Sequence, residues 1–349
     1  MHPNRKARFV LRWAAMGGCL LLASTVRAQD EPASRKVSEA PQDVTKKMTS
    51  AADTAQGWSR KTRLSGTFSY SHTNNVVGAQ DGFYFHGGLV LDGALNLRGG
   101  RSAWENGLKV QFTQSKTPPL DAFVKSLDNF DFQSTYYLRL KQPGWIGPYA
   151  RGRLNTQLFD GFEISAQDLA IRKLYLDGSE NVFTLPGEEN LKLTSSFEPL
   201  VLGQNAGIFV SPPGSDKFTL KAKLGFGLQE IVVGDSAFAV QDNGATPELE
   251  VQQLEQSVQG GGVLDVNLAG KTSGDVFWKV DTSFFLEAFT DSKIEANAFN
   301  MDLNALLSVA LTKWASLDYV LLIKHVPRIV DEWQTQSGLV LTVGFDLLR

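Results

Sequence analysis

Cysteine is nearly absent from this sequence, with one among 349 residues, at Cys19. Residues 1–28 begin with basic side chains, continue with the apolar run "WAAMGGCLLLAS" and end in small residues at Ala28, which predicts a cleaved secretory signal peptide. A membrane anchor is the alternative, but the run is shorter than the ~20 apolar residues of a spanning helix. A lipoprotein cleavage box at "MGGC" is a second alternative, but leucines follow Cys19 directly, where a mature lipoprotein usually turns polar. A chain that starts after Ala28 has no cysteine, which excludes disulfides, thiolate metal sites and cysteine nucleophiles.

An excess of positive charge is also missing. The sequence has 34 Lys and Arg against 37 Asp and Glu, a net charge of −3, so no basic field argues for nucleic acid. It has four histidines, and no paired histidines, cysteine cluster or Asp-x-Asp-x-Asp loop predicts a metal site. We therefore expect no metal, no cofactor and no nucleic-acid partner.

Helical periodicity of useful length is the third absence. Residues 29–57 are polar and nearly free of aromatics, which predicts a flexible periplasmic lead-in. From Trp58 onward, apolar and polar residues alternate in runs bounded by Gly, Pro, Asn, Asp and Ser, as in strands. We expect twelve, near 60–72, 83–98, 103–116, 129–141, 146–158, 191–200, 216–229, 254–268, 274–288, 297–312, 315–326 and 335–348.

Residues 276–289, "VFWKVDTSFFLEAF", show the alternation clearly. Positions i and i+2 of a strand share a face, so Trp278, Val280 and Phe284 lie on one face and Lys279 and Asp281 lie on the other. Soluble half-buried sheets alternate too, but these runs reach the ~9–11 residues that cross a bilayer. Only a closed sheet satisfies every backbone group inside hydrocarbon. We expect an all-β fold, a closed antiparallel transmembrane β-barrel of about twelve strands over residues 58–349; a soluble periplasmic β-protein is the alternative.

The connections alternate in length, which predicts the orientation of the barrel. Those at 99–102, 142–145, 269–273 and 313–314 are short, and those at 73–82, 117–128, 159–190, 230–253, 289–296 and 327–334 are longer. Short turns on one side and long loops on the other are typical of an outer-membrane barrel with both termini in the periplasm. Five tryptophans fall on the short-turn side, as an aromatic girdle requires: Trp58, Trp104, Trp145, Trp278 and Trp314. The connection 201–215 departs from the scheme, since it is long where a short turn is expected.

The C-terminal third, "LLSVALTKWASLDYVLLIKHVPRIVDEWQTQSGLVLTVGFDLL", has a Lys-Trp turn, a Pro-containing loop and a Gly-bearing last strand. It resembles Gram-negative outer-membrane β-barrel families of no agreed activity, among them a domain of unknown function and the families labelled salt-induced outer-membrane proteins. "SAWENGLKVQF", from Ser102, is similar to an early strand of those families. The resemblance implies a barrel in the cell outer membrane and lends no activity; we separately expect that the protein is not an enzyme. The resemblance also implies outer-membrane lipid and the barrel-assembly machinery as partners.

Strand parity assigns charged side chains to the lumen in an uneven way. On the first seven strands, the cations expected to face inward are Arg63, Arg98, Lys109, Arg139, Lys141, Arg151, Arg153, Lys192, Lys221 and Lys223, and the inward carboxylates are Asp92, Glu105, Asp131 and Glu198. On the last five strands, the carboxylates expected to face inward are Glu255, Asp265, Asp281, Glu287, Asp302, Asp318 and Asp346, and the inward cations are Lys279 and Lys324. A basic wall facing an acidic wall is typical of a pathway for a small charged solute with a transverse field. The alternative, which we favour, is that the two walls meet as a salt-bridge network that fills a narrow interior.

Arg139, Lys141, Arg151 and Arg153 are the densest group of cations. On neighbouring strands they can hold a carboxylate or phosphate, or they can pair with carboxylates across the lumen. We favour the second interpretation.

Two further functions stay open. The loops 159–190 and 230–253 can serve a receptor that binds at the outer surface. An outer-membrane lipid-modifying enzyme would need a serine–histidine pair, and His86 points inward level with Ser69 or Ser71. Nothing in the local sequence supplies an orienting carboxylate, so we expect no catalytic residue and an ordinary hydrogen-bonded histidine.

Overall fold

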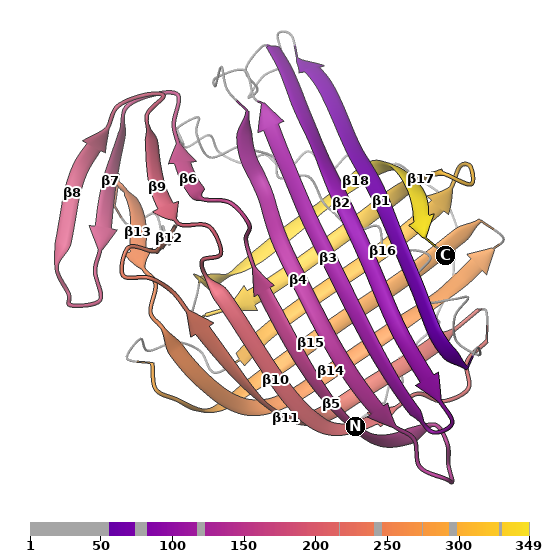
Figure 1. The fold of residues 1–349 in the computed structure, drawn as a ribbon. Coiled ribbons are helices and arrows are strands. Elements are labelled where there is room, and N and C mark those ends of the chain that lie inside the picture. Colours follow the sequence, from indigo (N-terminus) through magenta and orange to yellow (C-terminus); the bar gives the residue numbers. More distant parts are fainter. Residues whose placement is uncertain are drawn as a thin grey trace, which may run out of the picture.

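The computed structural model describes residues 56–73, 82–116, 123–215, 217–240, 246–273, 275–292, 299–327 and 330–348. Every regular element within these ranges is a strand (Figure 1). No helix in the described part is long and apolar enough to cross a membrane. The expected signal peptide, residues 1–28, and the lead-in up to residue 55 lie outside the described residues.

Twelve strands form one closed antiparallel barrel, which confirms the predicted fold. The chain closes where β1 pairs with β18, with Arg63 opposite Asp346 and Phe68 opposite Leu341. The barrel strands are β1 (Gly57–Thr73), β2 (Gly82–Gly99), β3 (Ser102–Lys116), β4 (Val124–Leu138), β5 (Ile146–Thr156), β10 (Leu200–Val210), β11 (Thr219–Val232), β14 (Ser257–Ser273), β15 (Val276–Thr290), β16 (Phe299–Ala310), β17 (Ala315–Val326) and β18 (Val330–Leu348).

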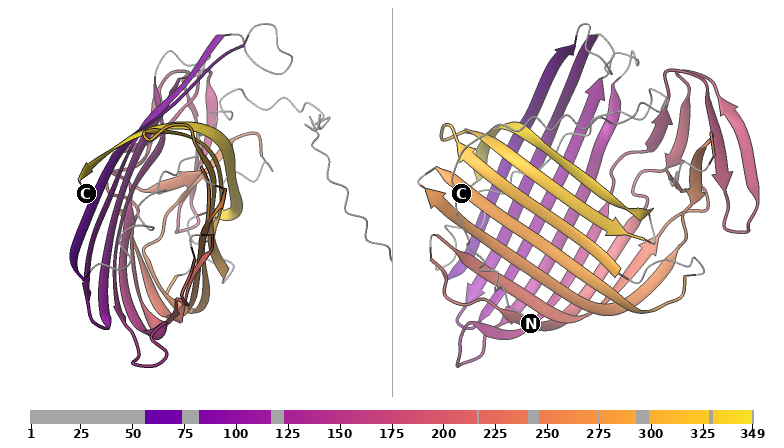
Figure 2. Two further views of the ribbon diagram at one scale, coloured as in Figure 1. Left: turned by 90° about the vertical axis from the view of Figure 1, so that its right-hand side faces the viewer. Right: turned by 180° about the vertical axis from the view of Figure 1, so that it is seen from behind.

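The barrel is flattened, as Figure 2 shows. Strands β1 to β5 form one wall, β14 to β18 form the other, and β10 and β11 turn between them. We call the end that carries Gly57, Leu348 and five of the connections the lower rim, and the opposite end the upper rim. The two longest connections, 157–199 and 233–256, lie at the upper rim, as expected. The expected alternation of lengths is otherwise wrong: β18 begins at Val330, so no long loop spans 327–334, and the lower connections 139–145 and 211–218 are at least as long as the upper one at 117–123.

The outer surface of the barrel is apolar and the inner surface is polar. Leu89, Leu224 and Leu339 face outward and are each about 60% exposed, while Asp92, Thr113 and Asp318 face inward and are fully buried. Trp58, Trp104 and Trp278 occupy the first three residues of their strands at the lower rim, and Trp145 and Trp314 lie in turns there. The predicted tryptophan rim is therefore confirmed. An apolar exterior with an aromatic rim is the surface of a barrel that crosses a membrane.

The two longest upper connections do not remain loops but fold together into a separate sheet. The connection after β5 contains β6 (Gly161–Ile164), β7 (Leu169–Leu174), β8 (Glu180–Leu185) and β9 (Asn190–Thr194); the connection after β11 contains β12 (Phe238–Val240) and β13 (Leu249–Gln253). Strand β13 pairs in parallel with β7 and joins the two connections in a four-stranded sheet of order β12-β13-β7-β8. We call this sheet, with the β6–β9 ribbon, the outer sheet; it stands beside the upper rim next to β5, β10 and β11 (Figure 1).

The outer sheet has its own hydrophobic core. Its buried members are Leu169, Ile171, Leu185, Phe238, Leu249 and Val251. Tyr175, Phe183, Leu191, Leu193 and Val240 pack against them. Because this core contains residues from both connections, the sheet is one unit rather than two loops.

One strand assignment from the sequence, 191–200, is wrong. Residues 190–194 form β9 in the outer sheet, and the barrel strand is β10, Leu200–Val210. Lys192 and Glu198 therefore lie outside the lumen. The correction also shortens the anomalous connection expected at 201–215, since the connection that follows β10 spans residues 211–218. The sequence "LVLGQNAGIFV" hides its strand character because Gly203 and Gly207 weaken strand propensity.

Candidate functional site

The lumen is the candidate functional site, because it gathers the barrel's charged side chains. On β11, Lys221 and Lys223 point inward, whereas Leu224 and Phe226 point outward and are exposed. On β14, Asp265 is buried on the inner face, with Leu264 exposed on the outer face. The alternation of polar and apolar positions thus continues through the strands that line the charged part of the lumen.

Three of the expected lumen residues meet at one corner of the barrel. Arg151 Nη1 lies 3.0 Å and Lys223 Nζ lies 3.6 Å from Asp265 Oδ2. The other carboxylate oxygen, Asp265 Oδ1, accepts from Ser283 Oγ at 2.7 Å. The side chain of Asp265 is only 4% exposed. One carboxylate on β14 therefore compensates two buried cations, which come from β5 and β11. We call these three residues the corner triad.

The bend of the wall brings the corner triad together. Strands β5 and β14 are three positions apart in the sheet, about 14 Å along a flat surface at ~4.8 Å per strand. Between them Gly207 on β10 faces Gly225 on β11. A Cβ atom at Gly207 would lie 2.1 Å from the Leu224 carbonyl oxygen, and one at Gly225 would lie 2.2 Å from that of Ala206. Glycine at both positions permits the backbone approach that folds the wall at this corner.

A second group of charges crosses the interior closer to the lower rim. Lys221 on β11 donates from Nζ to Glu105 Oε2 on β3 at 2.8 Å. Arg98 on β2 lies 3.6 Å from the other oxygen of Glu105. Lys221 also sits 3.8 Å above the centre of the Tyr137 ring, a cation–π distance. Because β3 and β11 are four positions apart in the sheet, this contact spans the lumen between them.

Aromatic side chains narrow the lower end of the lumen below these charges. Tyr137, Tyr149, Phe209 and Ala103 form a buried cluster, with the rings of Tyr137 and Phe209 edge to face at 5.0 Å. These residues are on β3, β4, β5 and β10. They fill the side of the barrel next to the corner triad.

Among the four cations of the expected basic wall that lie on barrel strands β5 and β11, Arg153 is the most accessible. It forms an ion pair with Asp131 on the neighbouring strand β4 and donates from Nε at 2.9 Å. Its side chain remains 40% exposed.

The residues of the expected acidic wall differ in their partners and in their burial. Asp281 pairs with Lys279 on its own strand and accepts from Asn267 at 2.8 Å. Asp318 is fully buried and accepts from Ser308 and from Ser316, the latter at 3.2 Å. Glu287 and Asp302 are partly buried, and the side chain of Asp346 lies outside the described part. Thus Asp265 joins the cations of the expected basic wall, and Asp281 and Asp318 are held by their own wall.

The expected cluster of four arginines and lysines does not form. Strand β4 ends at Leu138, so Arg139 and Lys141 lie in the β4–β5 turn at the lower rim. Arg151 lies opposite Thr135, four residues before Arg139, about 13 Å along the strand. The predicted strand, 129–141, was too long because the alternation continues through "LRLKQ" into the turn.

His86 lies on the inner face of β2, as expected, and its Nδ1 is 2.7 Å from Ser115 Oγ on β3. The predicted partners Ser69 and Ser71 have side chains outside the described part, although Ser69 is opposite His86 in the ladder. Both members of the observed pair are buried, and His86 Nε2 has no hydrogen-bond partner among the described residues. No orienting carboxylate of the kind that a catalytic triad uses touches this imidazole in the described part. Nor do any three His, Cys, Asp or Glu residues there gather closely enough to hold a metal ion.

Compared with known proteins, the sequence matches no family model and no curated protein. The resemblance to salt-induced outer-membrane proteins therefore stays a prediction.

Among solved structures, the chain is similar to an outer membrane channel from Pseudomonas putida F1, at 10% identity over 83% of this chain and 96% of that one, with a TM-score of 0.39. It is also similar to the translocator domain of the autotransporter NalP from Neisseria meningitidis, at 8% identity over 83% and 88% of the two chains, with a TM-score of 0.37. The β domain of the Bordetella autotransporter BrkA matches at 10% identity over 83% and 99%, with a TM-score of 0.33. At these identities and TM-scores the likeness supports no inference about activity.

Proposed function

We propose that the protein is a non-enzymatic outer-membrane barrel that provides a narrow pathway for small charged solutes. The apolar exterior and the tryptophan rim support a location in a bilayer. The lower rim, which carries both ends of the barrel sequence, faces the periplasm in this proposal, and the outer sheet, which the two longest connections form, is extracellular.

The accessibility of the charged lumen carries the proposal. Arg153 is 40%, Glu105 31% and Asp281 28% exposed, although each is in an ion pair. In an interior filled by a salt-bridge network these side chains would be buried, as those of the corner triad are. Twelve strands lie between the packed eight-stranded barrels and the open sixteen-stranded porins, so a partly filled lumen is expected.

The charge distribution supports a pathway that orients its solute. Arg153, Lys221 and the corner cations line one side, whereas Asp281, Asp302 and Asp318 belong to β15, β16 and β17 on the other. Opposed charges across a narrow pore act on a passing solute through a transverse field. Two carboxylates weaken this field: Asp131 compensates Arg153 on the same wall, and Glu105 compensates Lys221 from across the lumen.

Single-channel recording in planar bilayers tests the proposal. The wild-type protein should conduct steadily, and its ion selectivity should fall as salt screens the lumen charges. Arg153→Gln should raise the ratio of cation to anion permeability by about twofold at low salt, because it removes an accessible lumen cation. Arg172→Gln removes the same charge in the outer sheet and should leave the ratio unchanged. No current from barrels that are shown to be inserted by their shifted gel mobility would contradict the proposal and favour a filled, structural interior.

A second candidate is a receptor barrel that binds through the outer sheet. One observation favours it: the two upper connections have a shared apolar core instead of forming solvated loops. A binding partner would then meet the outer sheet without any conductance, so the same recording separates the two candidates.

A further inference from the structure

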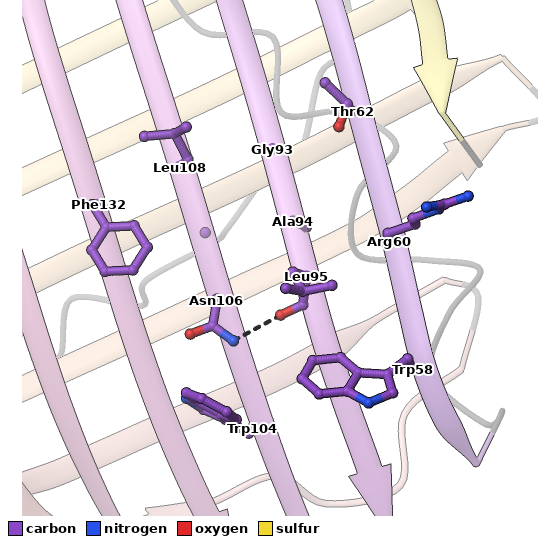
Figure 3. A pocket seen from close by; sticks show the side chains of 11 residues that line it. Trp58, Arg60, Thr62, Gly93, Ala94, Leu95, Trp104, Asn106, Leu108 and Phe132 are labelled. Atoms are coloured by element: carbon purple, nitrogen blue, oxygen red, sulfur yellow. Dashed lines mark hydrogen bonds between the residues drawn. The ribbon is translucent and has the colours of Figure 1, made fainter.

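A groove of about 370 Å³ lies on the outside of the barrel near the lower rim. It crosses β1 to β4, with Trp58 and Trp104 at its lower end and Thr62, Gly93 and Leu108 at its upper end (Figure 3). Because these residues alternate with the lumen-facing positions of their strands, the groove opens toward the surrounding lipid. Its volume is at the lower end of the ~300–1,000 Å³ typical of small-molecule sites.

Most polar groups beside the groove bind one another. Trp104 Nε1 donates to Ser134 Oγ at 2.8 Å, and Ser134 Oγ donates to Asn106 Oδ1 at 2.8 Å. Asn106 Nδ2 donates to the Leu95 carbonyl oxygen at 2.9 Å, the bond drawn in Figure 3. Such mutual bonding lets polar side chains face a bilayer without an unmet donor or acceptor.

Arg60 is the exception. It lines the edge of the groove on β1, is exposed, and has no carboxylate within ion-pair distance among the described residues. The last pair between β1 and β18 joins Thr62 to Leu348, so Arg60 extends past the described end of β18. Its guanidinium points away from β2 in Figure 3. A long exposed arginine keeps its stem on apolar surface and moves its head to the level of the lipid phosphates.

The rest of the groove suits an acyl chain. Leu95, Leu108 and Phe132 form apolar walls, and the rings of Trp58 and Trp104 lie 6.3 Å apart at the mouth. Gly93 forms part of the floor. A Cβ atom there would be 3.6 Å from Leu108 Cβ, an ordinary contact, so the backbone accepts a larger residue and the glycine serves to leave space.

We propose that this groove binds one anionic phospholipid of the periplasmic leaflet, with its phosphate on Arg60 and an acyl chain over Gly93. A cation on the lipid-facing surface that has no counterion among the described residues can attract an anion from the lipid itself, and each such cation near the surface contributes about fivefold in affinity. The inference rests on the proposed membrane location, but not on the proposed solute pathway.

Native mass spectrometry of the detergent-purified full-length protein tests the site. Phosphatidylglycerol and phosphatidylcholine with identical acyl chains are titrated separately. Wild type should bind one phosphatidylglycerol about fivefold more tightly than phosphatidylcholine. Arg60→Gln should abolish this preference, whereas Lys313→Gln, which removes an exposed cation next to Trp314 at the same rim, should keep it.

A second pair of variants tests the apolar part of the groove. Gly93→Val should weaken the binding of both lipids, because it fills the floor. Gly262→Val places the same side chain in open space on the outer face of β14 and should not. Equal binding by Arg60→Gln and Lys313→Gln, or by the two valine variants, would mean non-specific lipid contact only and would overturn the proposal. Since conductance is recorded separately, failure of lipid binding and failure of the pathway are distinguishable.

Discussion

Asp265 illustrates how single residues determine the interior of this barrel. It is one carboxylate between two cations, Arg151 and Lys223, and all three side chains are nearly inaccessible to water. A buried charge without a partner is costly, since its lost hydration is not replaced. The corner triad therefore depends on Asp265 more than on either cation.

Asp265→Asn should lower the free energy of unfolding by about 3 kcal/mol, because it leaves two buried cations without their counterion. Urea titration of the folded fraction in lipid vesicles measures the change. Asp281→Asn is the matched control, because Asp281 and its partner Lys279 are more accessible. That variant should cost less than about 1 kcal/mol. Equal losses from the two variants would contradict the importance assigned to the corner triad.

Strand alternation predicts which charges face inward, but not which of them meet. Lys223 and Asp265 are direct neighbours in the ladder, a register that a correct pairing of strands supplies. The contact between Arg151 and Asp265 depends on the bend at Gly207 and Gly225, and a linear pattern carries no signal for wall curvature. Arg139 and Lys141 show the opposite failure, since the alternation persists beyond the end of the strand.

At the scale of elements, the hairpin β7–β8 was predictable and was missed. The sequence "LAIRKLYLDGSENVFTL" has two alternating runs around an Asp-Gly pair, which is a strong hairpin signal. Gly178 adopts a φ of +84° in that turn, a conformation that favours glycine. The parallel pairing of β7 with β13 was not predictable, because about 75 residues separate the strands and no local pattern specifies their contact.

The β6–β9 ribbon is joined to the chain around it by Asp160. Lys192 Nζ donates to Asp160 Oδ2 at 2.8 Å, and the Ser196 amide and hydroxyl donate to Oδ1 at 2.7 and 2.8 Å. These hydrogen bonds, that from Lys192 first, lower the pKa of Asp160 from 3.8 to about 2.

The lowered pKa has a defined consequence for acid stability. A carboxyl whose pKa is lower in the folded state stabilises that state above pH 4, and this stabilisation is lost as the pH falls toward 2. We expect Lys192→Gln to raise the pKa of Asp160 toward its ordinary value. Carboxyl-carbon NMR titration of the refolded protein measures this directly, with Lys217→Gln as the control at the far rim. An unchanged pKa in Lys192→Gln would show that Ser196 alone holds the carboxylate.

At the scale of the whole molecule, the strand-to-strand hydrogen bonds of the barrel are separate from those of the outer sheet. The ladder between β5 and β10 is continuous from Asn155 opposite Val201 to Ile146 opposite Val210, and that between β11 and β14 continues to Ile231 opposite Ser257. Neither ladder includes a residue of the outer sheet. The sequence predicts eleven of the twelve barrel strands because each of these repeats the same two-residue pattern, which β10 hides, whereas the outer sheet consists of short strands that resemble polar loops.

This separation predicts that the barrel folds without the outer sheet. Replacing residues 161–194 and 238–253 by short Gly-Ser linkers removes the apolar core centred on Ile171 and Val251, but no barrel pair. The attachment of Leu158 and Phe159 to Asp128 on β4, at 2.9 and 2.7 Å, is retained.

The shortened protein should keep its heat-sensitive gel mobility and its urea midpoint should stay within about 0.5 M of wild type, because closure of the barrel satisfies its backbone groups internally. The shortened barrel should still conduct, and its conductance should exceed that of wild type if the outer sheet shields the opening of the lumen at the upper rim. A matched control replaces only residues 161–194, which leaves β12 and β13 without β7 and exposes the apolar face of β13; this variant should aggregate more than the double replacement. Failure of the double replacement to insert, with insertion of the single one, would show that the barrel requires residues 238–253 and that the two parts fold as one unit.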